Sequence, residues 1–149
     1  MSKRISPTLS ITMRPEVIKR LKERSEENTS RQIASDLQTF YSLLDAISIE
    51  MKGYFTTAEA CYLCDVFNGT LMDPSHIRYW PEQLAWNVED GAELCALNKK
   101  WETDDRALSE KLRSLTPAQA VWVWDRVQAF WRDPNRKPIR EIVKELFLT

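Results

Sequence analysis

Glycine is scarce in this chain, occurring 3 times in 149 residues against an average usage of about 7%. Tight hairpin turns depend on glycine because it adopts positive φ freely, so the shortage argues against a turn-rich sandwich or barrel. The glycine-rich loops that bind nucleotide phosphates, G-x-G-x-x-G and G-x-x-x-x-G-K-[ST], do not occur. A nucleotide-binding α/β enzyme is therefore not expected.

Long apolar runs and histidines are scarce as well. No apolar run reaches the roughly 18 residues of a membrane span, and the first residues do not form the apolar segment of a signal peptide. We therefore expect a cytoplasmic protein without a membrane partner. His76 is the single histidine, and no nucleophile is arranged near it in the sequence, so we expect neither an enzyme nor a cofactor.

The three cysteines form an odd set, which argues against a disulfide framework. Cys61 and Cys64 have the spacing of half a zinc site or of a redox pair, and Cys95 with His76 would complete a Cys₃His set. Cys61 and Cys64 lie in a predicted helix, where free cysteine is usually a buried apolar residue. We favour a place in the core and predict no metal site.

Charge and tryptophan divide the chain into two parts. Residues 1–31 contain eight basic and four acidic residues, whereas residues 52–149 contain 13 basic and 15 acidic residues. All six tryptophans lie in the second part. We predict two domains with different functions, residues 1–51 and residues 52–149.

The first domain is predicted to hold one strand and two helices. Residues 8–13 alternate polar and apolar side chains, which is typical of a half-buried strand. Pro15 suits a helix start, which predicts a helix over 15–26 whose Lys19, Arg20, Lys22 and Arg24 are interpreted as a solvated face. Thr29 and Gln32 fit a capping box before a helix over 30–51. Apolar residues repeat along that helix at spacings of 4, 3, 4 and 3: Ile33, Leu37, Phe40, Leu44 and Ile47.

A lone strand with two short helices cannot bury a core. A second copy that supplies a matching antiparallel strand would close the arrangement, so the sequence predicts a homodimer.

This order of elements over residues 3–50 resembles the ribbon-helix-helix family of DNA-binding proteins. The matching features are the alternating strand, the Pro15 helix start, and the Thr29-Ser30-Arg31 start that precedes Ile33 and Leu37. The family often has glycine where this chain has Asn28. The resemblance implies a β-ribbon in the major groove of double-stranded DNA. Its implied base-reading residues are Thr8, Ser10 and Thr12, and its implied phosphate-binding residues are Thr29, Ser30 and Arg31, with Lys3, Arg4 and Arg14 adding contacts.

Residues 52–149 are predicted to form helices alone. Thr56 with Glu59 and Thr116 with Gln119 fit capping boxes, and Pro117 stands at a first helical position. We also expect helix starts near Pro81, Thr103 and Pro138 and an interruption at Gly91.

The predicted fold class is mainly α, with an N-terminal ribbon-helix-helix and an all-helical C-terminal domain. The predicted function is a dimeric, sequence-specific DNA-binding transcriptional regulator of the repressor type, whose C-terminal domain adds dimer contacts or binds a protein partner. The alternatives are an antitoxin, a plasmid or phage accessory protein for DNA partition or mobilisation, and a helical interaction protein that binds no DNA.

Overall fold

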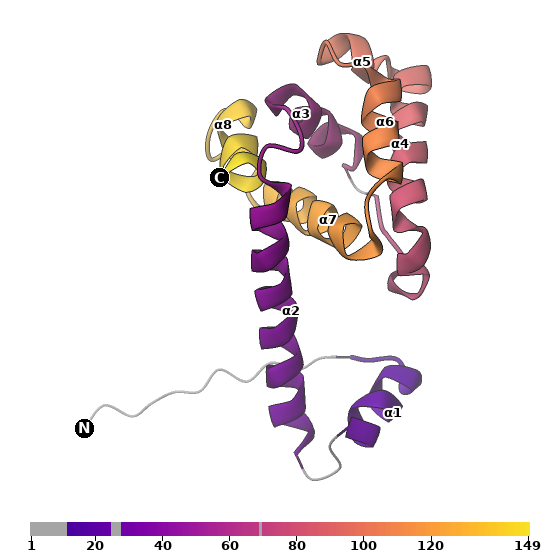
Figure 1. Ribbon diagram of the computed structural model, residues 1–149, viewed down its shortest axis with the longest axis vertical. Helices are drawn as coiled ribbons and strands as arrows, with labels where there is room; N and C mark the ends of the chain where they lie inside the picture. Colours follow the sequence, from indigo (N-terminus) through magenta and orange to yellow (C-terminus); the bar gives the residue numbers. More distant parts are fainter. Residues whose placement is uncertain (1–11, 25–27, 69) are drawn as a thin grey trace, which may run out of the picture. The chain divides into compact units, whose positions relative to one another are not determined.

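The computed structural model describes residues 12–24, 28–68 and 70–149, and their regular elements are all helical (Figure 1). Within these ranges, no helix has both the length and the apolar character that a membrane crossing requires. The elements in chain order are α1 (Pro15–Arg24), α2 (Thr29–Met51), α3 (Thr57–Val66), the 3₁₀ helix η1 (Pro74–Tyr79), α4 (Trp80–Cys95), α5 (Leu97–Lys100), α6 (Asp105–Arg113), α7 (Pro117–Arg132), α8 (Ile139–Val143) and the π-helical turn η2 (Lys144–Leu148).

The predicted ribbon-helix-helix fold is wrong, because the described residues contain no strand. Residues 8–11 of the predicted strand lie outside the described ranges, and Thr12 and Met13 precede α1 in neither helical nor strand conformation. The physical reason is that a strand needs a neighbouring strand for its backbone hydrogen bonds, whereas a helix makes them within itself. Alternation over six residues shows which side chains would share a face of a strand, but it does not show whether a second strand is present to pair with it.

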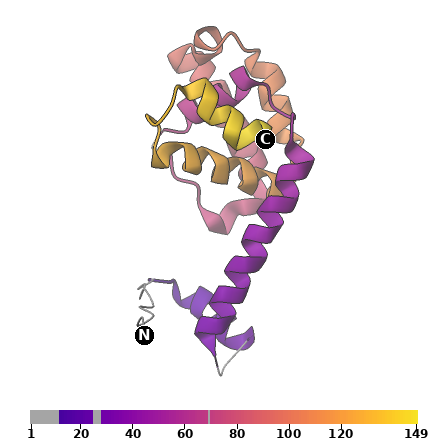
Figure 2. The same cartoon turned by 90° about the vertical axis from the view of Figure 1, so that its left-hand side faces the viewer.

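The chain separates into two compact units, Met1–Leu43 and Leu44–Thr149. The division falls inside α2, so one continuous helix contributes to both units (Figure 2). In the first unit, Leu21 is the single buried residue among those described. Arg24 of α1 donates to Asp36 of α2 at 2.6 Å. The described residues of the first unit therefore form almost no core.

The second unit has an extensive core in which α7 takes a central place. This helix packs against α3, α4, η1 and η2, and α4 lies along α6 (Figure 1). The last turns of α2 join the same core through Leu44, Ile47 and Met51. Ser48 of α2 also accepts a hydrogen bond from Trp122 Nε1 of α7 at 2.7 Å. The C-terminal half of α2 is thus fixed by both apolar and polar contacts.

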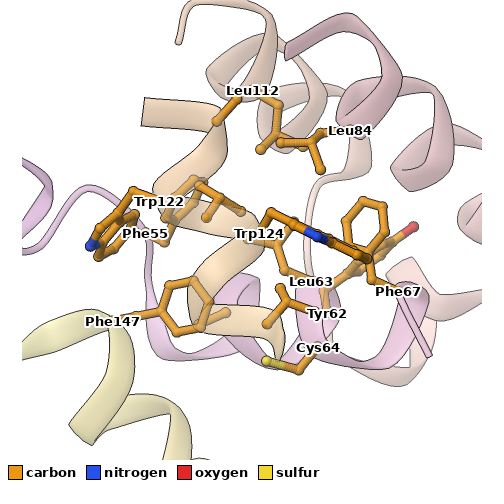
Figure 3. Packing of buried hydrophobic residues seen from close by; sticks show 14 of the residues in the cluster. Phe55, Tyr62, Leu63, Cys64, Phe67, Leu84, Leu112, Trp122, Trp124 and Phe147 are labelled. Carbon is orange, nitrogen blue, oxygen red and sulfur yellow. The ribbon is translucent and has the colours of Figure 1, made fainter. Parts of the chain in front are cut away.

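Aromatic side chains fill this core edge to face (Figure 3). Trp122 and Phe147 have ring centroids 5.6 Å apart, and Phe55 lies 6.3 Å from Phe147. Trp124 packs 5.9 Å from Phe67 and 6.5 Å from Trp80. Edge-to-face pairs add about 0.5–1.5 kcal/mol each to the gain from burial. The second unit therefore folds around contacts of its own.

Local sequence rules place the helix starts well. The capping boxes of Thr56 with Glu59 and of Thr116 with Gln119 are confirmed, with both reciprocal hydrogen bonds present. The start near residue 103 is shifted by one position, because Asp104 rather than Thr103 accepts from the first N–H groups of α6. Aspartate is the stronger N-cap residue of the two.

Gly91 does not interrupt α4, which continues to Cys95. A Cβ placed on Gly91 would lie 2.8 Å from Val66 Cγ2 and 3.1 Å from Leu97 Cδ1. Glycine is thus needed for close packing of α4 against α3 and not for a turn.

One ion pair of the second unit joins a buried carboxylate, that of Glu59, to the partly exposed Lys111. Lys111 Nζ lies 2.7 Å from Glu59 Oε1 and also donates to the Tyr54 carbonyl at 3.2 Å. The same Glu59 oxygen accepts from Thr56 N–H at 2.9 Å. Tyr54 returns a hydrogen bond from its hydroxyl to the Lys111 carbonyl at 2.9 Å. This network ties the start of α3 to α6.

Replacement of Lys111 should destabilise the second unit. Lys111→Met leaves the Glu59 carboxylate buried without its cation, which should lower the free energy of unfolding by about 1–3 kcal/mol. Urea unfolding followed by tryptophan fluorescence measures the change. Arg136→Met, which breaks an exposed pair with Glu145, is the matched control and should have much less effect. Equal losses in the two variants would contradict a structural role for the Glu59–Lys111 pair.

Tyr62 should make the second unit sensitive to alkaline pH. Its hydroxyl is buried and donates to the Val88 carbonyl at 2.5 Å, and burial, with smaller contributions from Asp105, Cys95 and Asp65, raises the pKa of Tyr62 to about 12. An unfolded tyrosine loses its proton near pH 10. The protonated Tyr62 therefore contributes its full stabilisation below pH 10, and this contribution should be lost as the pH rises toward 12.

Urea unfolding between pH 8 and pH 12 tests this dependence. Tyr62→Phe should be less stable at pH 8, since it loses a hydrogen bond, but its stability should fall less steeply above pH 10. Tyr79→Phe, at an exposed position, should keep the wild-type slope. The same slope in all three proteins would show that Tyr62 is not the titrating group.

Candidate nucleic-acid interface

The implied base-reading residues are not brought together by the described structure. Thr8 and Ser10 lie outside the described residues, and Thr12 is exposed just before α1. Since no strand is present around Thr12, the alternation that would place these three side chains on one face is not observed. The described structure therefore provides no ribbon surface for base contacts.

The implied phosphate-binding residues of the N-terminal segment are described in part. Lys3 and Arg4 lie outside the described residues, whereas Arg14 is exposed immediately before α1. The Arg14 carbonyl accepts from Val17 N–H at 3.0 Å and from Ile18 N–H at 3.2 Å. Arg14 therefore occupies the N-cap position, with its side chain in solvent. Pro15 follows as the first helical residue, as predicted.

The start of α2 differs from the predicted capping box. The helix begins at Thr29, and Asn28 Oδ1 accepts from Arg31 N–H at 3.0 Å. Gln32 turns away from the cap, because its side chain donates to Asp36 Oδ1 at 2.9 Å. Asparagine is among the best N-cap residues, so Asn28 satisfies the first turn in place of Thr29. Thr29 is half-buried, and Ser30 and Arg31 are exposed.

Exposed cations surround α1. Lys19, Arg20 and Lys22, which we call the α1 cations, project from the sides of the helix away from buried Leu21. Among the described residues none of the three has an acidic partner within ion-pair distance, whereas Arg24 is paired with Asp36. Sequence reasoning missed the Arg24–Asp36 pair, because the two residues are 12 positions apart on different helices. The pair also distinguishes Arg24 from the other cations of α1.

Large apolar side chains are exposed beside these cations. They come from both helices of the first unit and have exposed fractions from 38% to 54%. Leu37 and Phe40, two members of the apolar repeat of α2, belong to this exposed set. We call the following set the exposed apolar face: Val17, Ile18, Leu37, Phe40, Tyr41 and Leu43.

A shallow, open hollow on α1 is lined by Pro15, Ile18, Lys19, Lys22 and Glu23. Such a surface suits contact with an extended partner better than enclosure of a small molecule, which needs a deeper pocket.

Cys61 and Cys64 take the core positions that the sequence suggested for them. Cys61 and Cys64 are buried in α3, and Cys95 is exposed at the end of α4. Burial raises the pKa of both buried thiols, which disfavours the thiolate that binds metals. His76 is exposed, 3.9 Å from Asp73 Oδ2. Within the described ranges, no three His, Cys, Asp or Glu side chains gather as metal ligands would.

Thiol reactivity should distinguish these positions. In the folded protein at pH 8, one thiol per chain, that of Cys95, should react rapidly with Ellman's reagent. The thiols of Cys61 and Cys64 should react on the order of 100-fold more slowly, because they need a local opening of the core. Cys95→Ser should remove the fast phase, and Cys61→Ser should keep it. Two or more thiols reacting at the fast rate would contradict burial.

The surface of the second unit carries one feature that the sequence did not indicate. Trp80 and Trp122 are buried, whereas Trp86 on α4 is 53% exposed. Asp90 and Glu93 are also exposed on α4, one and two turns after Trp86. This face of α4 is acidic and aromatic, in contrast to the basic first unit.

Comparison with protein-family models, with curated proteins and with solved structures found no match for this chain. Its function is therefore inferred from its own side chains.

Proposed function

We propose that the protein binds double-stranded DNA through the cations of its first unit and acts as a DNA-binding regulator. The observation that carries the proposal is the excess of basic over acidic residues in residues 1–31, joined to the exposure of the α1 cations. Lysine and arginine bind DNA phosphates with the release of condensed counterions, which supplies most of the affinity at moderate salt.

The geometry of the first unit suits this contact without a ribbon. The ten residues of α1 span about 15 Å, and the major groove of DNA admits a helix. Arg14 and Arg31 are exposed at the starts of α1 and α2 and add cations to the same unit. Backbone contacts of this kind position a protein on DNA, and base contacts add its sequence preference.

The second unit favours a regulator over an antitoxin whose C-terminal tail folds only on a partner. It has a core of its own, from Leu44 to Phe147. An antitoxin whose C-terminal part folds only on its toxin does not fit such a unit. In this proposal, the exposed Trp86 on an acidic helix face is the contact for a protein partner of the regulator.

Neutralising the α1 cations should weaken DNA binding and reduce its salt dependence. Lys19, Arg20 and Lys22 are changed together to Gln, which preserves helix propensity. Fluorescence anisotropy of a labelled duplex is titrated at several salt concentrations. If all three contact phosphates, the slope of log K against log salt should fall by about 2.7 per chain, at about 0.9 for each phosphate.

A control with the same change of charge keeps the test specific. Lys99, Arg132 and Lys144 are exposed on the second unit and are changed together to Gln. This variant should keep the wild-type slope. Wild-type protein that binds no duplex at low salt, or equal effects of the two triple variants, would contradict DNA binding through α1 and favour an interaction protein without a nucleic-acid ligand.

A further inference from the structure

The exposed apolar face of the first unit is a group of neighbouring side chains and not a set of isolated surface residues. Four of its members, Leu37, Phe40, Tyr41 and Leu43, lie within two turns of α2, and Phe40 packs edge to face on Tyr41 at 5.5 Å. Apolar patches of several adjoining large side chains mark interaction surfaces. The described part of the chain leaves this patch uncovered.

The spacing on α2 indicates what kind of surface would cover it. Apolar residues recur at intervals of 4, 3, 4, 3 and 4 along the helix, at Ile33, Leu37, Phe40, Leu44, Ile47 and Met51. This is the narrow seam by which a helix packs on a similar helix. Its last three positions are buried in the second unit, and Leu37 and Phe40 are exposed. The free half of the seam is therefore available to another helix.

The charge of the patch favours a second copy as that partner. From Leu37 to Leu44 α2 carries no charged residue. Asp36, at one end of this stretch, is already paired with Arg24 of the same chain. In a two-fold interface a residue close to the symmetry axis faces its own copy, so an unpaired charge at the centre would meet its like. A neutral, aromatic centre avoids this repulsion and matches the composition of interface cores.

We propose that two copies of the chain associate through the N-terminal half of α2, with Leu37 and Phe40 at the centre and Val17 and Ile18 of α1 at the margin. The interface uses helices alone. It rests on different residues from the proposed DNA contact, but it would place two sets of α1 cations in one particle.

Light scattering after size exclusion tests the proposal on the full chain. At about 100 μM, the wild-type protein should have twice the 17.5 kDa mass of one chain. The double variant with Leu37→Gln and Phe40→Gln should dissociate at least about 100-fold more readily, because four large apolar side chains leave the interface. Its tryptophan fluorescence should match the wild type, since all six tryptophans lie in the second unit.

Two further proteins make each outcome decisive. Ile49→Gln removes an exposed apolar residue of α2 from outside the seam and should leave the dimer intact. A monomeric wild type, or a dimeric double variant, would overturn the proposal. If the wild type is monomeric and removal of residues 2–11 makes it dimerise, the apolar face is covered by the chain's own first residues, which also overturns it.

The two proposals fail separately. The triple Gln variant of the α1 cations should remain dimeric even though its DNA binding is weak. A wild-type protein that dimerises but binds no duplex would leave the interface standing and remove the DNA contact.

Discussion

The last turns of α2 are held in the core of the second unit by Leu44, Ile47 and Met51 and by the hydrogen bond from Trp122 to Ser48. The apolar residues that enter this core continue at the same helical spacing toward the N-terminus of α2. There they include Phe40 and Leu37, which have no core of their own to enter. The exposure of Leu37 and Phe40 in the first unit and the burial of Leu44 and Ile47 in the second thus belong to one continuous seam.

The two units differ in how they are stabilised. Full burial of a large apolar side chain contributes about 1.5–3 kcal/mol, and the second unit buries many such side chains, with edge-to-face aromatic pairs between α7 and its neighbours. The described part of the first unit buries Leu21 and adds the exposed Arg24–Asp36 pair. An exposed pair contributes at most about 1 kcal/mol. The first unit thus depends on contacts outside its own described residues far more than the second does.

What the sequence could predict was local. The capping boxes at Thr56 and Thr116 each need four consecutive residues, and both are confirmed. The strand predicted over residues 8–13 was wrong, because alternation alone does not show whether a second strand is present to accept its backbone hydrogen bonds. The role of Gly91 was misjudged for a similar reason, since it is set by side chains of other helices: Val66 of α3 and Leu97 of α5.

The candidate site shows the same limit. Charge, which is additive along the chain, identified the basic first unit, and Arg14, Ser30 and Arg31 are exposed there. The sequence could not show that Asn28 would take the Arg31 N–H, or that Asp36 would take Arg24, because each choice depends on where a helix begins or how two helices lie. The sequence could give the spacing of the apolar residues along α2, but it could not show where along the helix their burial ends.

The proposed dimer and the proposed DNA contact would strengthen one another. A unit with a few cations binds DNA without sequence preference at dissociation constants of about 10⁻⁴ to 10⁻⁶ M at physiological salt, whereas specific complexes reach about 10⁻⁸ M or tighter. Joining two such units makes the second contact intramolecular and can raise the overall affinity by about 10² to 10⁴. Residues such as Leu37 and Phe40, which do not contact DNA in this scheme, would then set the occupancy of a DNA site as strongly as Lys19 or Arg20.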